Sequence, residues 1–189
     1  MKFYNREDEM KLIRQTEERS RSTACFTAIM GRRRVGKTTL LRKALEGKKY
    51  IYLFVSRTSE VLLCDAFKRE ITDTLSIPIY GTPTRFRDLF ELLMQHAASE
   101  HFTLIIDEFQ DFDRVNPSIF SDIQNMWDRY SPLAKINFIV CGSIYSLMKH
   151  IFEDHKEPLF GRLTSKFVLK PFKTSVLIEI LRDYNPAYT

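Results

Sequence analysis

The chain has 189 residues, of which 44% are hydrophobic and 28% are charged, a composition typical of a globular protein long enough to bury a core. Its net charge of +5 suits polyanionic partners without identifying one. Charged side chains near the N-terminus exclude a secretory signal, and no apolar run approaches the roughly 20 residues that cross a bilayer. With Cys25, Cys64 and Cys141 widely spaced in apolar surroundings, these features predict a cytoplasmic protein with reduced thiols and no membrane contact.

Helical and strand-like segments alternate along the chain. A first helix is expected over 6–20, with Asn5 as its cap, and later helices over 37–47, over 59–75, over 84–99, from the Asn116-Pro117 cap to Tyr130, after Ser143, and over 174–181. Runs of β-branched and aromatic residues predict strands at 25–30, 50–55, 102–107, 135–142 and 165–172. The third and fourth runs are almost continuously apolar, which is typical of central strands covered on both faces. The pattern predicts an α/β fold with a five-stranded, mostly parallel sheet.

The stretch GRRRVGKT, residues 31–38, matches the phosphate-binding pattern G-x-x-x-x-G-K-[ST] between a strand and a helix. Glycines permit backbone angles that turn the N–H groups of the loop toward phosphate oxygens, and the helix N-terminus favours an anion. Lys37 would reach the β- and γ-phosphates, and the Thr38 hydroxyl would bind Mg²⁺. The predicted nucleotide-binding residues of this segment are Gly31, Arg32, Arg33, Arg34, Val35, Gly36, Lys37, Thr38 and Thr39.

Two alternatives apply to this stretch. The glycines alone would also suit a turn that caps an ordinary helix. The three arginines in the variable positions would form either a solvated basic loop tip or a contact for nucleic acid.

Asp107 and Glu108 follow the apolar run TLII and supply the second element of such a site. Asp107 would hold Mg²⁺ through water, and Glu108 would polarise an attacking water molecule. The alternative is a pair of solvated carboxylates at a strand end. A small-molecule kinase is a rival enzyme class, but kinases of this size usually lack the adjacent glutamate and carry an arginine-rich lid that we do not find here.

With both motifs placed, the chain resembles the archaeal-type ATPase family, a branch of the AAA+ superfamily among the additional-strand P-loop NTPases. The segment FYNREDEM, residues 3–10, is similar to the family pattern F-x-G-R-x-x-E, which lies against adenine. This resemblance implies that Phe3, Tyr4 and Arg6 contact the nucleotide, with Asn5 in place of the family's glycine. The alternative for this segment is a helix cap with a hydrophobic anchor.

Two further segments extend the resemblance. FIVCGS, residues 138–143, is similar to the strand whose polar end senses the γ-phosphate, which implies that role for Ser143. A helix N-cap is a second role for Ser143, compatible with the first. PLFGR, residues 158–162, is similar to a family segment whose position implies that Arg162 acts in trans as an arginine finger in a homo-oligomer. The alternative is a surface arginine.

The resemblance implies a three-layer P-loop NTPase core over residues 1–172, followed over 173–189 by the start of a helical lid that is truncated. The expected function is ATP binding and Mg²⁺-dependent hydrolysis coupled to conformational change, weak in this core alone. The expected catalytic residues are Lys37, Glu108, Ser143 and Arg162. A non-hydrolysing nucleotide-dependent switch, or a DNA-associated regulatory module, is the alternative.

Overall fold

Five strands form one sheet in the computed structural model, which describes residues 4–185. The strands are β1 (Cys25–Met30), β2 (Tyr50–Phe54), β3 (Phe102–Asp107), β4 (Ile136–Gly142) and β5 (Ser165–Val168). They lie in the order β2-β3-β4-β1-β5, and every pair of neighbours is parallel. The α/β class and the five strands predicted from the sequence are confirmed, and the sheet is entirely parallel in the part of the chain described.

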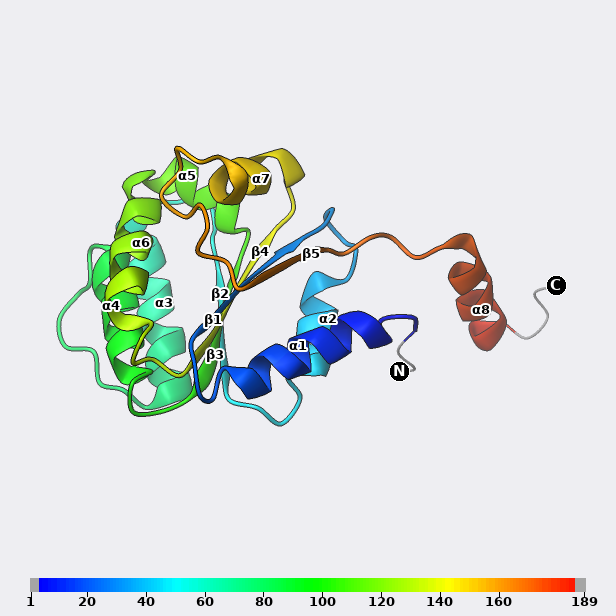
Figure 1. Cartoon of the computed structure of the whole chain (residues 1–189), viewed down its shortest axis with the longest axis horizontal. Coiled ribbons are helices and arrows are strands. Elements are labelled where there is room, and N and C mark those ends of the chain that lie inside the picture. Colours follow the sequence, from blue (N-terminus) through cyan, green and yellow to red (C-terminus); the bar gives the residue numbers. More distant parts are fainter. Residues whose placement is uncertain (1–3, 186–189) are drawn as a thin grey trace.

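Helices cover both faces of this sheet and make the three layers (Figure 1). One face carries α1 (Glu7–Arg19) and α2 (Lys37–Ala44), and the other carries α3 (Glu60–Leu75), α4 (Phe86–His96) and α6 (Ser118–Tyr130). The short elements η1 (Phe109–Asp111), α5 (Phe112–Val115) and α7 (Tyr145–Glu153) pack into the core of the second face. Two cores therefore lie back to back across the sheet.

The central strands contribute to both cores. Leu104 and Ile106 of β3 belong to the core beneath α3, α4 and α6, whereas Ile105 belongs to the core beneath α1 and α2. Every residue of β3 and of β4 is buried, as the continuous apolar runs predict. Cys25, Cys64 and Cys141 are also buried, and none of them forms a disulfide in the described structure.

Three local expectations have different outcomes. Asn116 does cap α6, because its Oδ1 accepts a 3.1 Å hydrogen bond from the backbone N–H of Ser118. The predicted cap at Asn5 is wrong: α1 begins at Glu7 without a side-chain cap, and Asn5 has a φ of +46°. The predicted strand over 165–172 ends at Val168, shortly before Pro171, which has no N–H to donate to a neighbour.

Helix α8 (Thr174–Tyr184) follows β5 by an extended segment and lies beyond the edge of the sheet, on the same side as the N-terminal end of α1 (Figure 1). The Tyr4 hydroxyl donates a 2.9 Å hydrogen bond to Oδ2 of Asp183, which ties α8 to the N-terminal segment. Among residues 4–185, no helix is both long and apolar enough to span a bilayer.

Candidate functional site

The candidate site lies at the carboxyl edge of the sheet, where loops from three adjacent strands meet. In a parallel sheet all strands end at the same edge, so the segments after β3, β4 and β1 are neighbours there. These segments carry the acidic pair Asp107-Glu108, then Ser143, then the glycine-containing loop 31–36. Strand β4 separates the other two, so Ser143 lies between them, as the resemblance implies.

The two glycines of the loop are needed for different reasons. Gly36 precedes the first residue of α2 with a φ of +95°, and a Cβ atom there would meet no heavy atom within 4 Å, so its backbone angle is what requires glycine. Gly31 has no such angle, but a Cβ atom on it would lie 2.7 Å from the carbonyl oxygen of Leu169. The expectation that both glycines serve the backbone angles of the loop is therefore corrected at Gly31, which supplies space for the chain after β5.

Lys37 is buried at the start of α2, and its ammonium group lies across its own loop. Nζ donates a 2.7 Å hydrogen bond to the carbonyl oxygen of Gly31 and lies 3.4 Å from that of Arg32. These contacts hold the charge at the mouth of the loop. A phosphate group bound there would meet this ammonium together with the backbone N–H groups at the N-terminus of α2.

Asp107 and Thr38 bring oxygen atoms together beside the loop. Thr38 Oγ1 lies 3.4 Å from Oδ2 of Asp107, and Oδ1 of Asp107 accepts a 2.9 Å hydrogen bond from the backbone N–H of Glu108. Hydroxyl and carboxylate oxygens are the ligands that Mg²⁺ prefers, and phosphate oxygens and water complete such sites. The residues present therefore fit a Mg²⁺ ion bound with a nucleoside triphosphate.

Glu108 has a backbone φ of +54°, which is uncommon for a residue other than glycine. The residue is buried. Its Oε2 accepts two 2.6 Å hydrogen bonds, one from Ser143 Oγ and one from Gln110 Nε2, while Arg33 Nε lies 3.7 Å from Oε1. Burial opposes ionisation, but these two hydrogen bonds and the charges of Lys37 and Arg33 outweigh it and lower the pKa of Glu108. Glu108 is therefore a charged acceptor near neutral pH.

The N-cap alternative for Ser143 is not what the structure contains. Helix α7 begins at Tyr145, the residue before it is Ile144, and no side chain caps this end. The Ser143 hydroxyl is directed to Glu108 instead.

Sequence reasoning missed Tyr52 and Gln110. The Tyr52 hydroxyl donates a 2.5 Å hydrogen bond to Oδ2 of Asp107, and burial and this bond together raise the pKa of Tyr52, so the phenol keeps its proton. Gln110 is buried beside Glu108. For Gln110, the sequence offers one signal, its place in the largely polar stretch DEFQD. For Tyr52, the signal is the alternation of strand β2: Ile51 and Leu53 belong to the core on the opposite face of the sheet.

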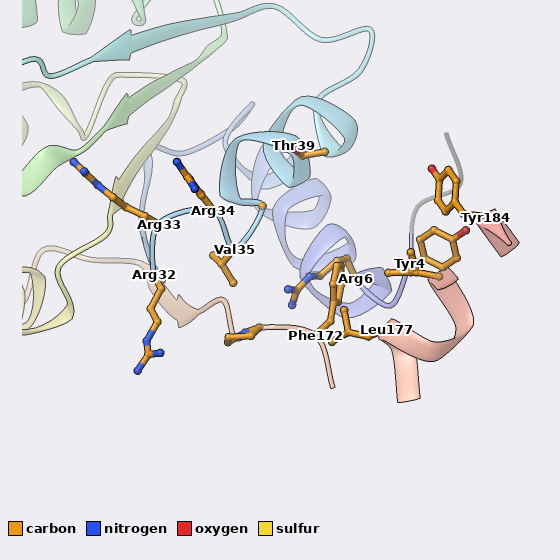
Figure 2. A pocket seen from close by; sticks show the side chains of 13 residues that line it. Tyr4, Arg6, Arg32, Arg33, Arg34, Val35, Thr39, Phe172, Leu177 and Tyr184 are labelled. Carbon is orange, nitrogen blue, oxygen red and sulfur yellow. The ribbon is translucent and has the colours of Figure 1, made fainter. Parts of the chain in front are cut away.

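Two adjoining cavities surround the glycine-containing loop. The polar pocket has a volume of about 570 Å³ and is lined by Arg33, Arg34, Gly36, Lys37, Thr38, Thr39, Phe54, Asp107 and Glu108. The apolar pocket has a volume of about 500 Å³, and residues from the N-terminal segment, the loop, the chain after β5 and α8 line it (Figure 2). Arg33, Arg34, Gly36 and Thr39 line both, so the two pockets meet at the loop.

The three loop arginines differ in direction. In Figure 2, Arg33 and Arg34 extend to the same side of the loop, and Arg32 extends to the opposite side. Arg33 and Arg34 line both pockets, whereas Arg32 lines the apolar pocket alone. The sequence prediction treated the three arginines alike. The structure separates Arg32 from the other two, because their surroundings differ.

Tyr4 and Arg6 line the apolar pocket, and Phe3 lies outside the described residues. Arg6 is buried: its Nη2 donates a 2.6 Å hydrogen bond to the carbonyl oxygen of Lys170, and its Cζ lies 4.5 Å from the centroid of the Phe172 ring. Asn5 stands where the family pattern has glycine, and its left-handed backbone is one that asparagine tolerates better than most residues.

Arg162 is not brought to this site within the chain. It lies before β5 and lines neither the polar nor the apolar pocket. Its Nη2 and Nε lie 2.9 Å and 3.2 Å from the two carboxylate oxygens of Asp128 on α6, a two-pronged ion pair.

The sequence matches the model of a family described as an ATPase domain predominantly from Archaea, over residues 3–186. A protein of Methanocaldococcus jannaschii, MJECL04, is 28% identical over 177 residues, which cover 94% of this chain and 38% of that protein. Two solved structures from Aeropyrum pernix have a similar fold. The ORC2 protein, in ADPNP and ADP complexes, has a TM-score of 0.70 at 18% identity and covers 96% of this chain and 51% of its own. The ORC1 protein, in complex with DNA, has a TM-score of 0.66 at 13% identity and covers 96% and 49%.

The chain thus spans between about two fifths and one half of the length of these relatives. At these identities the two solved structures show similarity of fold alone.

Proposed function

This chain belongs to the family of ATPase domains found predominantly in Archaea, and we propose that it binds ATP with Mg²⁺ and hydrolyses it. One observation carries the proposal: Lys37, Thr38, Asp107 and Glu108 line a single polar pocket of about 570 Å³ although they come from two separate segments of the chain. An ammonium group, a hydroxyl and two carboxylates at the N-terminus of a helix are the groups that phosphoryl chemistry needs.

Each group has a role that its surroundings support. Lys37 and the N–H groups of the loop would bind the phosphates, and Thr38 and Asp107 would hold Mg²⁺, which when bound offsets the phosphate charge. Glu108 would accept a proton from the attacking water, and its low pKa keeps it ionised for that task. Ser143, bonded to Glu108, would detect the γ-phosphate by exchanging that bond.

Adenine would occupy the apolar pocket, against Arg6, Tyr4 and the segment after β5. Leu177, Ile180 and Tyr184 of α8 line the same cavity, so a bound base would touch the core and α8 together. This shared lining supports a conformational response to nucleotide, in which α8 would act as a lid against the core that precedes it.

Two partners besides nucleotide are part of the proposal. Nucleic acid is one, because the net charge is +5, Arg32 points away from the polar pocket, and the ORC1 structure of similar fold contains DNA. A second copy of the chain is the other, with Arg162 acting in trans. That role requires Arg162 to leave Asp128 and the carbonyl oxygen of Phe160, and the partial exposure of the ion pair lets water replace these contacts.

A non-hydrolysing switch is the second candidate function. It is favoured by the engagement of Glu108: Oε2 accepts from both Ser143 and Gln110, and Arg33 Nε lies 3.7 Å from Oε1, the oxygen that is left for water. If these bonds persist and Arg33 closes on Oε1 in the nucleotide complex, ATP would be bound without turnover.

The test combines binding with turnover. Isothermal titration should detect Mg-ATP binding to the wild-type chain and none to Lys37→Ala, while Lys43→Ala, an exposed lysine on the same helix, serves as the matched control. Phosphate release, measured with and without DNA, should occur in the wild type and stop in Glu108→Gln. Unchanged ATP affinity in Lys37→Ala would refute the site, and binding without phosphate release in the wild type would support the switch.

A further inference from the structure

We propose that Tyr52 is a positioning residue for the metal site: its hydroxyl holds the carboxylate of Asp107 in the orientation that Mg²⁺ requires. This inference rests on the proposed function, because it assigns a supporting partner to a residue of the same site. Groups that hydrogen-bond to metal ligands commonly set the direction of those ligands and change metal affinity by 10–100-fold when they are removed.

The sheet places Tyr52 for this contact. In the parallel pairing of β2 with β3, Tyr52 aligns with Ile105, and Asp107 follows two residues later on the same face. Tyr52 and Ile105 both belong to the core on the α1 and α2 side, which is the side of Thr38. A long phenol side chain on β2 can therefore reach the end of β3 diagonally, and its hydroxyl lies 2.5 Å from Oδ2 of Asp107.

The hydrogen bonds at Asp107 explain why this hydroxyl matters. Oδ1 accepts from the backbone N–H of Glu108, and Oδ2 accepts from Tyr52, with Thr38 Oγ1 3.4 Å from the same Oδ2. One donor on each oxygen fixes the rotation of the carboxylate about its own bond. A carboxylate oxygen accepts more than one hydrogen bond, so Oδ2 keeps acceptor capacity for a metal-bound water beside the Thr38 hydroxyl.

Among the contacts in the described part of the chain, loss of the Tyr52 hydroxyl would leave Oδ2 of this buried carboxylate with the longer contact to Thr38. The carboxylate would then gain freedom to rotate, and metal binding would have to restrict it again. Within the described residues, Tyr52 makes no hydrogen bond to the loop glycines or to Lys37 and lines neither pocket, so affinity for the nucleotide without metal should be preserved.

The experiment compares Tyr52→Phe, which removes only the hydroxyl, with Tyr50→Phe, a tyrosine on the same face of the same strand and also half-buried. Mn²⁺ is titrated into the ATP-loaded full chain, and free Mn²⁺ is measured by electron paramagnetic resonance. ATP affinity in EDTA is measured in parallel by isothermal titration. We expect about tenfold weaker Mn²⁺ binding in Tyr52→Phe, with wild-type values for Tyr50→Phe and for ATP in EDTA.

Each other outcome is decisive. Unchanged Mn²⁺ affinity in Tyr52→Phe, or tighter binding, overturns the positioning role, because tighter binding means that the tyrosine competes with the metal. An equal loss in Tyr50→Phe overturns it as well, since the effect would then come from packing of the strand. If the wild-type chain binds neither ATP nor Mn²⁺, the proposed function itself fails. If the wild type binds both and Tyr52→Phe binds them equally well, only the positioning role of Tyr52 fails.

Discussion

The hydroxyl of Ser143 donates a 2.6 Å hydrogen bond to Oε2 of Glu108, joining the residue after β4 to the residue after β3. The bond has two consequences. It favours the charged form of Glu108, and together with the Gln110 bond it fills Oε2, so a water molecule would have to use Oε1 for proton transfer.

Ser143→Ala should shift the pH profile of ATP hydrolysis. Removing a hydrogen bond to the carboxylate destabilises its charged form, so the pKa of Glu108 rises and the acidic limb of kcat moves to higher pH by about one unit. The rate of phosphate release between pH 4 and 8 measures it, with Ser131→Ala at the end of α6 as a control. A profile that falls in amplitude without moving would argue that Ser143 acts on phosphate alone.

Glu108→Gln should reduce the loss of folding stability at low pH. The pKa of Glu108 is lower in the folded chain than its ordinary value of 4.5, so the unfolded chain takes up the proton first. The contribution of Glu108 to stability is therefore complete above its ordinary pKa and is lost as pH falls through the folded value. Urea unfolding at pH 7 and at pH 3 checks it: the wild type should lose more stability than Glu108→Gln over this interval, and equal losses would contradict the bonded geometry.

Arg33→Ala should weaken ATP binding more than Arg32→Ala. Both changes remove one positive charge from the same loop, but Arg33 lines the polar pocket and lies 3.7 Å from Glu108, whereas Arg32 points to the other side. Loss of a charge-assisted contact to phosphate in Arg33→Ala should raise the Kd for ATP about tenfold. This increase should be smaller at high salt, because Arg33 is exposed and salt screens its charge. Isothermal titration at two salt concentrations measures both variants. Equal effects would mean that only the net charge of the loop matters.

Gly31→Ala and Gly36→Ala should both destabilise the fold, for different reasons. A Cβ atom at Gly31 would lie 2.7 Å from the Leu169 carbonyl, a collision with main chain that costs about 1–3 kcal/mol. At Gly36 there is space, but the φ of +95° costs alanine about 1–2 kcal/mol. Gly31→Ser should resemble Gly31→Ala, whereas Gly36→Asn should recover part of the loss because asparagine tolerates positive φ. Chemical denaturation of the four variants tests this difference.

Asn5 illustrates where local sequence patterns mislead. Asparagine before a polar, acidic stretch is typical of a helix cap, yet here it adopts a φ of +46° and α1 starts two residues later. Asparagine favours both environments, since its short side chain supports caps and also tolerates the left-handed region. The next residue, Arg6, is buried against Lys170 and Phe172, and such contacts with residues far away in the sequence are not visible in the local pattern.

The sequence by itself determined the class of the fold and the strands that form its centre, because periodicity within short stretches sets both, and its motifs indicated the family by resemblance. The segments expected to bind a nucleotide stay predictions from the same motifs. Only the tertiary structure decided that Tyr52 bonds to Asp107, that Gln110 and Ser143 hold Glu108, that Gly31 makes room for Leu169, and that Arg162 pairs with Asp128. Apart from the Gln110–Glu108 bond, which joins residues two apart, these contacts link residues 34 or more positions apart in the chain. The register of the sheet and the packing of its loops set such contacts, and no local pattern in the chain encodes them.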